Sequence, residues 1–195
     1  MIKFLSIKMT RIIERTSASP KASHAVLAYG LEIIITSIIG FLLLVVSSLI
    51  LGQPFAWLYF SVGFVPLRTT GGGFHAKSHI NCFAITVLMF SVSVLVSYHL
   101  LWNPLAYFAI SLISFVLIIL FSPVEASNKP LNAMRKRVNR CRSIIISACF
   151  VACSVVLLAA GISIGALNLV WMGIASSSAS LLVAKVIYKE RREEP

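Results

Sequence analysis

The residues of this chain that could do chemistry gather in one run, RTTGGGFHAKSHINC, over positions 68–82. A cysteine protease needs a thiolate nucleophile and a base that accepts the thiol proton. Cys82 is the candidate nucleophile and His75 the candidate base. In one continuous helix, seven residues would separate the pair by roughly 10 Å along the axis. Proton transfer needs about 2.6–3.2 Å or one bridging water, so the pair predicts a backbone break between them.

Two features of the run could supply that break. Ser78, or else Asn81, is suited to cap the N-terminus of a following helix. Either cap would place Cys82 in the first helical turn, where free N–H groups and the helix dipole favour a thiolate. The glycines at 71–73 would let the preceding chain turn back and bring His75 over the sulfur. Their amide groups could also hold an oxyanion.

Zinc binding is the main chemical alternative. His75, His79 and Cys82 follow a spacing of i, i+4 and i+7, so one helix could present all three to Zn²⁺. The run lacks the Glu of a His-Glu-x-x-His peptidase motif, and the sequence has no clear fourth ligand nearby. A membrane-edge loop with an incidental cysteine is the non-catalytic alternative.

Two charged residues could support the site. Arg68 could hold a substrate carboxylate, or it could orient the protein at the membrane surface. Glu32 is the one acid within an expected membrane span, and an intramembrane carboxylate suggests a functional site. It could orient His75 as the third member of a triad, or it could pair with Arg68 or with a backbone group.

The elements that carry these residues are expected to be membrane helices. Of the 195 residues, 58% are hydrophobic and 12% are charged, about half the charged share of a typical soluble domain. The composition predicts an all-α integral membrane protein with about six transmembrane helices. The expected segments are 31–51, 55–66, 80–101, 105–122, 143–160 and 166–187. The second is short or broken, because 12 residues rise only about 18 Å as a helix against a hydrocarbon core of roughly 30 Å.

The basic residues predict the orientation of the segments. All 17 Lys and Arg residues fall on one face of the membrane if every segment crosses it. The positive-inside rule makes that face cytoplasmic and places both termini inside. The net charge of +11 is thus explained by topology and by the anionic lipid bilayer, and no nucleic acid partner is expected.

The expected organisation has three parts. A basic cytoplasmic N-terminal segment covers residues 1–30 and forms either an interfacial amphipathic helix or a plain basic tail. A polytopic membrane domain covers 31–187, and a basic cytoplasmic tail covers 188–195. The long connection at 123–142 ends in a basic run that suits anionic headgroups or an acidic partner.

The sequence resembles the accessory gene regulator protein B (AgrB-like) family. The resemblance rests on Arg68-x-x-x-Gly72-Gly73-x-His75 with Cys82 seven residues further, on YGLE at the start of the first segment, and on PVEASNKPL after the fourth. Members are membrane-embedded cysteine endopeptidases of quorum-sensing systems. The resemblance implies that Cys82 and His75 are catalytic. The candidate supporting residues are Glu32, Arg68, Gly72, Gly73 and Ser78, on the arguments given above.

The resemblance also implies a defined reaction, without a cofactor or metal. The cysteine would cleave the C-terminal tail from a short precursor peptide (AgrD-like) that has an amphipathic leader and an acidic tail. A side chain of the precursor would then capture the acyl-enzyme thioester and form a thiolactone or lactone ring. We therefore expect a multi-pass protein of the cell membrane with its active site at the cytoplasmic face, and the family suggests a homodimer. A small membrane exporter or channel is the non-enzymatic alternative.

Overall fold

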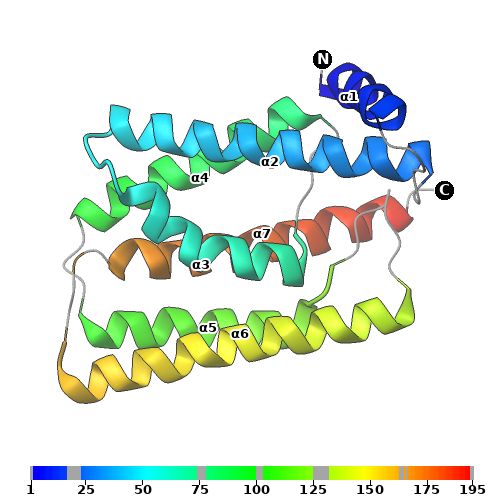
Figure 1. Cartoon of the computed structure of the whole chain (residues 1–195). Coiled ribbons are helices and arrows are strands. Elements are labelled where there is room, and N and C mark those ends of the chain that lie inside the picture. The colour runs from blue at the N-terminus through cyan, green and yellow to red at the C-terminus, as the bar shows by residue number, and fades with distance from the viewer. Residues whose placement is uncertain are drawn as a thin grey trace. The chain divides into compact units, whose positions relative to one another are not determined.

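In a computed structural model of the chain, the regular elements of the described residues are helices (Figure 1). The structure describes residues 2–16, 23–73, 78–99, 103–124, 132–162, 165 and 167–193. The helices are α1 (Ile2–Thr16), α2 (His24–Ile50), α3 (Ala56–Gly71), α4 (His79–His99), α5 (Pro104–Phe121), α6 (Ala133–Ala160) and α7 (Leu167–Glu193). No strand occurs among these residues, which confirms the expected all-α class.

Five of the helices in the described part are long and apolar enough to cross a membrane, namely α2, α4, α5, α6 and α7. Such lengths follow from the bilayer, because backbone N–H and C=O groups in hydrocarbon must be paired within the helix. The protein is thus an all-α membrane protein. The sixth crossing and the sides on which the termini lie stay predictions.

The second expected segment differs from its prediction at the C-terminal end. Helix α3 has 16 residues and runs past Pro66 to Gly71, whereas the expected apolar segment covered 55–66 and was allowed to extend as far as Leu67. Hydroxyl groups help to satisfy carbonyls around the proline: Thr70 Oγ1 donates to Pro66 O at 2.8 Å, and Thr69 Oγ1 donates to Val65 O at 2.9 Å. The segment is therefore short but unbroken, and its last turn carries Arg68.

Residues 1–47 and 48–195 form two separate compact units. The first contains α1 and most of α2. For the N-terminal segment the sequence left open a helix or a plain basic tail, and the structure has a helix, α1. The ring atom Nδ1 of His24, the first residue of α2, lies 3.0 Å from a carboxylate oxygen of Glu14. The interfacial position of α1 stays a prediction.

The second unit is arranged around α7. Helix α7 packs against α3, α4 and α5, while α6 packs against α5 and α3. Along the chain, α3, α5 and α7 run in one direction and α4 and α6 run in the other (Figure 1). Helices α3 and α5 therefore end, and α4 and α6 begin, at one end of this unit, whereas α4 and α6 end, and α5 and α7 begin, at the other. The alternating directions of these helices agree with the prediction that the basic residues lie on one face of the membrane.

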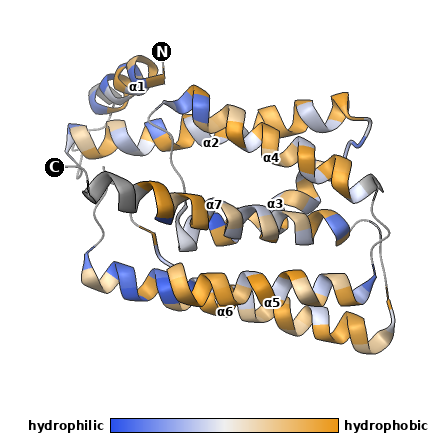
Figure 2. Ribbon diagram, turned by 180° about the vertical axis from the view of Figure 1, so that it is seen from behind, coloured by the Kyte–Doolittle hydropathy of each residue, from blue (hydrophilic) through white to orange (hydrophobic). Residues whose placement is uncertain are grey.

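The basic part of α6 is confined to its start. The helix begins at Ala133, ten residues before the expected membrane segment, and hydrophilic residues mark its first turns, with apolar residues beyond (Figure 2). Mean hydropathy along the sequence identifies the apolar part of a helix, which lies in lipid. The same helix can continue with polar residues into water. The expected start at 143 is therefore the start of the apolar part.

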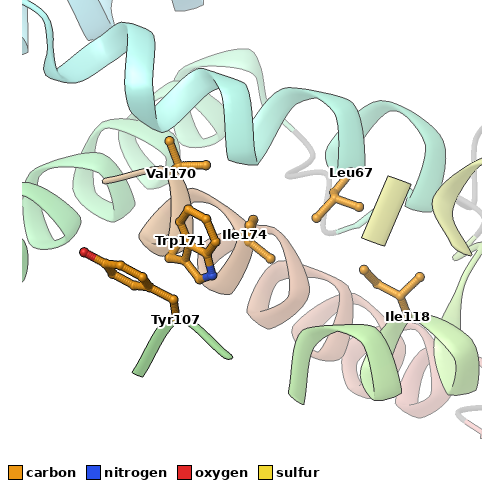
Figure 3. Close-up of a cluster of buried hydrophobic side chains, with 6 residues drawn as sticks. All are labelled: Leu67, Tyr107, Ile118, Val170, Trp171 and Ile174. Atoms are coloured by element: carbon orange, nitrogen blue, oxygen red, sulfur yellow. The ribbon is translucent and has the colours of Figure 1, made fainter. Parts of the chain in front are cut away.

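A buried cluster holds α7 to α3 and α5 (Figure 3). It consists of Leu67, Tyr107, Ile118, Val170, Trp171 and Ile174. The rings of Tyr107 and Trp171 lie 4.8 Å apart between centroids, and Tyr107 donates its O–H to Asn168 Oδ1 at 2.6 Å. Tyrosine and tryptophan bury large apolar surfaces, so this cluster fixes the rotation of α7 about its axis.

Small residues let the helices of the second unit approach closely. A Cβ at Gly63 of α3 would overlap Val170 O, and a Cβ at Gly173 of α7 would overlap Phe60 O. Paired hydroxyls join the helices elsewhere. The pairs are Ser93–Ser176 at 3.2 Å, Ser111–Ser154 at 2.7 Å and Ser114–Ser178 at 3.1 Å. Close backbone packing and interhelical hydrogen bonds are the forces that associate helices in lipid.

Candidate active site

Cys82 lies in the first turn of α4 and is half-buried. Its amide N–H donates to Ser78 O at 3.1 Å, and the amide N–H of Ile80 donates to Ser78 Oγ at 3.3 Å. Ser78 thus caps the N-terminus of α4, which is the first of the two positions that the sequence allowed. The amide groups of a helix start carry partial positive charge, so the sulfur of Cys82 lies where an anion is favoured.

Arg68 reaches the same region from the last turn of α3. Its side chain is half-buried, and its guanidinium lies over the backbone of Gly73, where a Cβ would overlap Nη1 of Arg68. The φ angle of Gly73 is +144° and that of Gly72 is +79°. Both values favour glycine. The chain therefore turns at these two residues, and the arginine folds over the turn.

A bond to another connection fixes the turn. The amide N–H of Val124, just after α5, donates to Gly71 O at 3.0 Å. A Cβ at Gly72 would overlap Val124 O. The connections that follow α3 and α5 are thus joined where both leave the helices.

Cys82 and Arg68 line one small cavity of about 10 Å³. The described residues that line it come from α3, α4 and α7 and are Phe64, Arg68, Cys82, Ile85, Thr86, Met89 and Ser180. A volume of about 10–15 Å³ holds one water molecule. The cavity thus has room for about one water molecule, and a thiol and a guanidinium group lie in its wall.

Sequence reasoning missed the contribution of α7. Ser180 is 98 positions from Cys82 and is 8% exposed, yet it lines the same cavity. The available signal was the polar run from Ser176 to Ser180 in an otherwise apolar segment. That run alone does not tell which serine faces the cysteine.

Two expected members of the site are not placed against Cys82. His75 lies outside the described residues, so its role as the base stays a prediction. Glu32 belongs to α2 in the first unit, where its carbonyl oxygen accepts a hydrogen bond from Thr36 Oγ1 at 2.7 Å. Its roles as an orienting carboxylate or as a partner of Arg68 also stay predictions.

The residues suggested for zinc are only partly described. His79 is the first residue of α4 and is exposed. In the described ranges, no group of three His, Cys, Asp or Glu side chains is placed to hold a metal ion. Because His75 lies outside those ranges, the zinc alternative is decided by experiment.

The family of the chain follows from a comparison with known protein families. The model of the family described as Accessory gene regulator B matches residues 6–182. The chain belongs to the accessory gene regulator B family. The match confirms the resemblance seen in the sequence and includes every residue that lines the cavity. No curated protein and no solved structure matches the chain.

Membership of the accessory gene regulator B family sets the broad function. The chain takes part in quorum-sensing peptide processing, its partner is a peptide precursor, and its apolar helices make it a multi-pass membrane protein. The chemistry of the processing step depends on the residues of the candidate site.

Proposed function

We propose that the chain is a membrane-embedded cysteine endopeptidase that cleaves the C-terminal tail from a precursor peptide and closes the remainder into a ring. The observation that carries the proposal is the position of Cys82, in the first turn of a capped helix and in the wall of a cavity shared with Arg68. A helix N-terminus and a nearby cation are the surroundings in which cysteine acts as a thiolate nucleophile.

The reaction begins when His75 accepts the thiol proton of Cys82. The thiolate attacks the carbonyl carbon of the scissile peptide bond, and the C–N bond breaks as the tail leaves as an amine that takes the proton from His75. The product is an acyl-enzyme thioester on Cys82. A thiol or hydroxyl of the precursor then attacks this thioester, gives its proton to His75 and forms the ring, while Cys82 leaves as a thiolate. Atoms and charges balance, with no metal or cofactor.

The remaining expected residues have supporting roles in this proposal. Glu32 orients the imidazole of His75. Gly72 and Gly73 allow the turn that brings His75 back toward the sulfur, and Ser78 keeps Cys82 in the first turn of α4. Arg68 contributes positive charge beside the sulfur.

The surroundings of the site suit the proposed substrate. The basic connections of the second unit leave its helices at the end where Cys82 lies, which favours a peptide with an acidic tail and a cytoplasmic active site in the cell membrane. Arg135, Arg137 and Arg142 at the start of α6 are exposed, so they suit anionic headgroups or the acidic tail. We also propose that the chain forms a homodimer.

The test uses the purified full chain in lipid nanodiscs with a synthetic precursor peptide, chosen from the neighbouring reading frames by an amphipathic start, an internal Cys or Ser and an acidic end. Mass spectrometry should detect the released tail, the cyclic product and, in short incubations, precursor fragment attached to Cys82. Cys82→Ala should abolish all three. Cys149→Ala, which alters an exposed cysteine of α6, should leave them unchanged and is the matched control.

The same assay separates the alternatives. A thiol alkylator should block cleavage and 1,10-phenanthroline should not. Inhibition by the chelator that zinc reverses would instead assign His75, His79 and Cys82 to a metal site. Cleavage that survives in Cys82→Ala would overturn the proposal. Export of an uncleaved peptide by Cys82→Ala vesicles would indicate a transporter.

A further inference from the structure

Ser180 and Arg68 meet at one point of the site. Ser180 Oγ lies 2.9 Å from the position that a Cβ would occupy on Gly73, and Nη1 of Arg68 overlaps the same position. The missing side chain of Gly73 thus leaves room where a guanidinium from α3 and a hydroxyl from α7 come together. Both side chains line the cavity that Cys82 also lines.

The other described residues in the wall of this cavity offer few hydrogen-bond donors. Phe64, Ile85 and Met89 contribute apolar surface. The hydroxyl of Thr86 donates to Cys82 O at 2.9 Å, within α4. An arginine has five N–H donors and no acceptor, and a serine hydroxyl has one donor. Among the described residues that line the cavity, Arg68 and Ser180 are therefore, besides the thiol itself, the side chains whose donors could reach a group inside it.

The volume fits an oxygen atom of the reaction. When a thiolate attacks a carbonyl carbon, the electron pair of the C=O π bond moves to the oxygen. The sulfur and this oxygen are then bonded to the same carbon, so the oxygen lies next to Cys82. A cavity of about 10 Å³ holds about one water molecule. It therefore has room for such an oxygen atom but not for a substrate side chain.

We propose that Arg68 and Ser180 form the oxyanion hole of the Cys82 reaction. The proposal rests on the proposed function, because it assumes that Cys82 attacks a carbonyl. In the tetrahedral intermediate, a C–S bond has formed and the carbonyl oxygen is negative. The Arg68 N–H and Ser180 O–H groups donate to it, and the C=O bond is restored when the C–N bond breaks. Donors held in place before the reaction are effective because they need no reorganisation.

The placement of Ser180 on α7 explains how the hole is held rigid. Helix α7 is buried among α3, α4 and α5, and Gly173 and Gly63 allow it to contact the α3 backbone directly. The donors therefore come from two helices locked to each other, while the nucleophile comes from the start of a third. We expect the serine to matter for the rate of acyl transfer rather than for peptide binding.

The experiment compares two reactions of the same thiol in the full chain in nanodiscs, with Cys141, Cys149 and Cys153 replaced by Ala. p-Nitrophenyl acetate acetylates Cys82 through a tetrahedral oxyanion and releases p-nitrophenolate. Methyl methanethiosulfonate converts the same thiolate to a methyl disulfide and releases methanesulfinate, without an oxyanion. Mass spectrometry of the Cys82 peptide gives both rates. Neither reagent requires the precursor to be known.

Removal of one oxyanion donor typically lowers the rate by about 10²–10³-fold. Ser180→Ala should therefore slow acetylation at least tenfold. It should leave the rate of methylthiolation within about twofold of the parent. Ser180→Thr, which keeps a hydroxyl, should restore much of the acetylation rate. Ser178→Ala is the matched control, because Ser178 is a buried serine of α7 that pairs with Ser114 and does not line the cavity. It should leave both rates unchanged.

Two outcomes would overturn the oxyanion hole. One is acetylation by Ser180→Ala at the rate of the parent. The other is an equal loss of acetylation and methylthiolation in Ser180→Ala, which would mean that the serine controls access or packing. Precursor cleavage by Cys82→Ala is measured separately, and if cleavage persists the proposed function fails. If Cys82→Ala abolishes cleavage but Ser180→Ala is acetylated at the parent rate, the oxyanion hole alone is refuted.

Discussion

The amide of Val124 donates a hydrogen bond of 3.0 Å to the carbonyl oxygen of Gly71, which joins the chain leaving α5 to the chain leaving α3. The bond holds the turn at Gly72 and Gly73 against a neighbouring connection. Arg68 folds over that turn, and α4 with Cys82 begins a few residues later. The geometry of the site therefore depends on glycine at position 72.

We expect Gly72→Ala to destabilise the protein and to reduce cleavage. Gly72 has φ +79° and ψ −154°, a region open essentially to glycine alone, which costs other residues about 1–3 kcal/mol. Its new Cβ would also overlap Val124 O. Thermal unfolding in detergent measures the first effect and tail release the second. The control is Gly161→Ala at φ +64°, with no atom within 4 Å of its Cβ. Equal effects of both variants would contradict the role of the Val124 contact.

The contact between α3 and α7 should be sensitive to one methyl group. Gly173→Ala would press a Cβ against Phe60 O, and overpacking of this kind costs typically about 1–3 kcal/mol. We also expect cleavage to fall, on the order of 10–100-fold, because the shift of α3 would move Arg68. Gly30→Ala in α2, where a Cβ meets nothing within 4 Å, should be as stable as the parent or more so. Full activity in Gly173→Ala would show that the site does not depend on this helix contact.

Tyr107→Phe should reduce stability and leave catalysis intact. The variant loses the hydrogen bond to Asn168 and leaves the buried Oδ1 atom of Asn168 without this donor, which costs about 1–3 kcal/mol. Tyr107 lies in the first turn of α5 and Cys82 in the first turn of α4, and these two helices begin at opposite ends of the second unit (Figure 1). Thermal unfolding and tail release measure the two effects. Tyr59→Phe, a partly buried tyrosine against the same cluster, is the control, and a loss of kcat in Tyr107→Phe would contradict the expectation.

The orientation can be tested with single cysteines in a cysteine-free chain. Met134→Cys is placed at the start of α6, where Met134 is 78% exposed, and Gly165→Cys lies in the connection before α7. A membrane-impermeant maleimide should label position 165 in intact cells, and position 134 only after permeabilisation, because the positive-inside rule puts the basic connection in the cytoplasm. The reverse pattern would place the active site outside and would contradict the topology.

Much of the architecture could be predicted from the sequence because the bilayer acts locally along the chain. Runs of apolar residues and the one-sided placement of Lys and Arg indicate membrane helices and their orientation without reference to any contact. The cap at Ser78 is also a local property, since the serine and the amide that it accepts from are two residues apart. Cys82 in the first turn of α4 follows from that cap.

Tertiary structure decided which helix faces which. In a membrane helix, apolar residues occur all round the axis, so hydropathy has little periodicity from which to deduce the buried side. The glycine contacts of α3 with α7 depend on how distant segments of the chain interlock. The same holds for the rotation of α7 that brings Ser180 to the cavity of Cys82, 98 positions away in the sequence. The continuation of α3 past Pro66 has the same origin, because α3 packs against α7 and α6 and Leu67, the residue after the proline, is part of the buried cluster. The sequence alone thus determined the class of the protein and the nucleophile that we propose, whereas packing decided which side chains share the cavity with it.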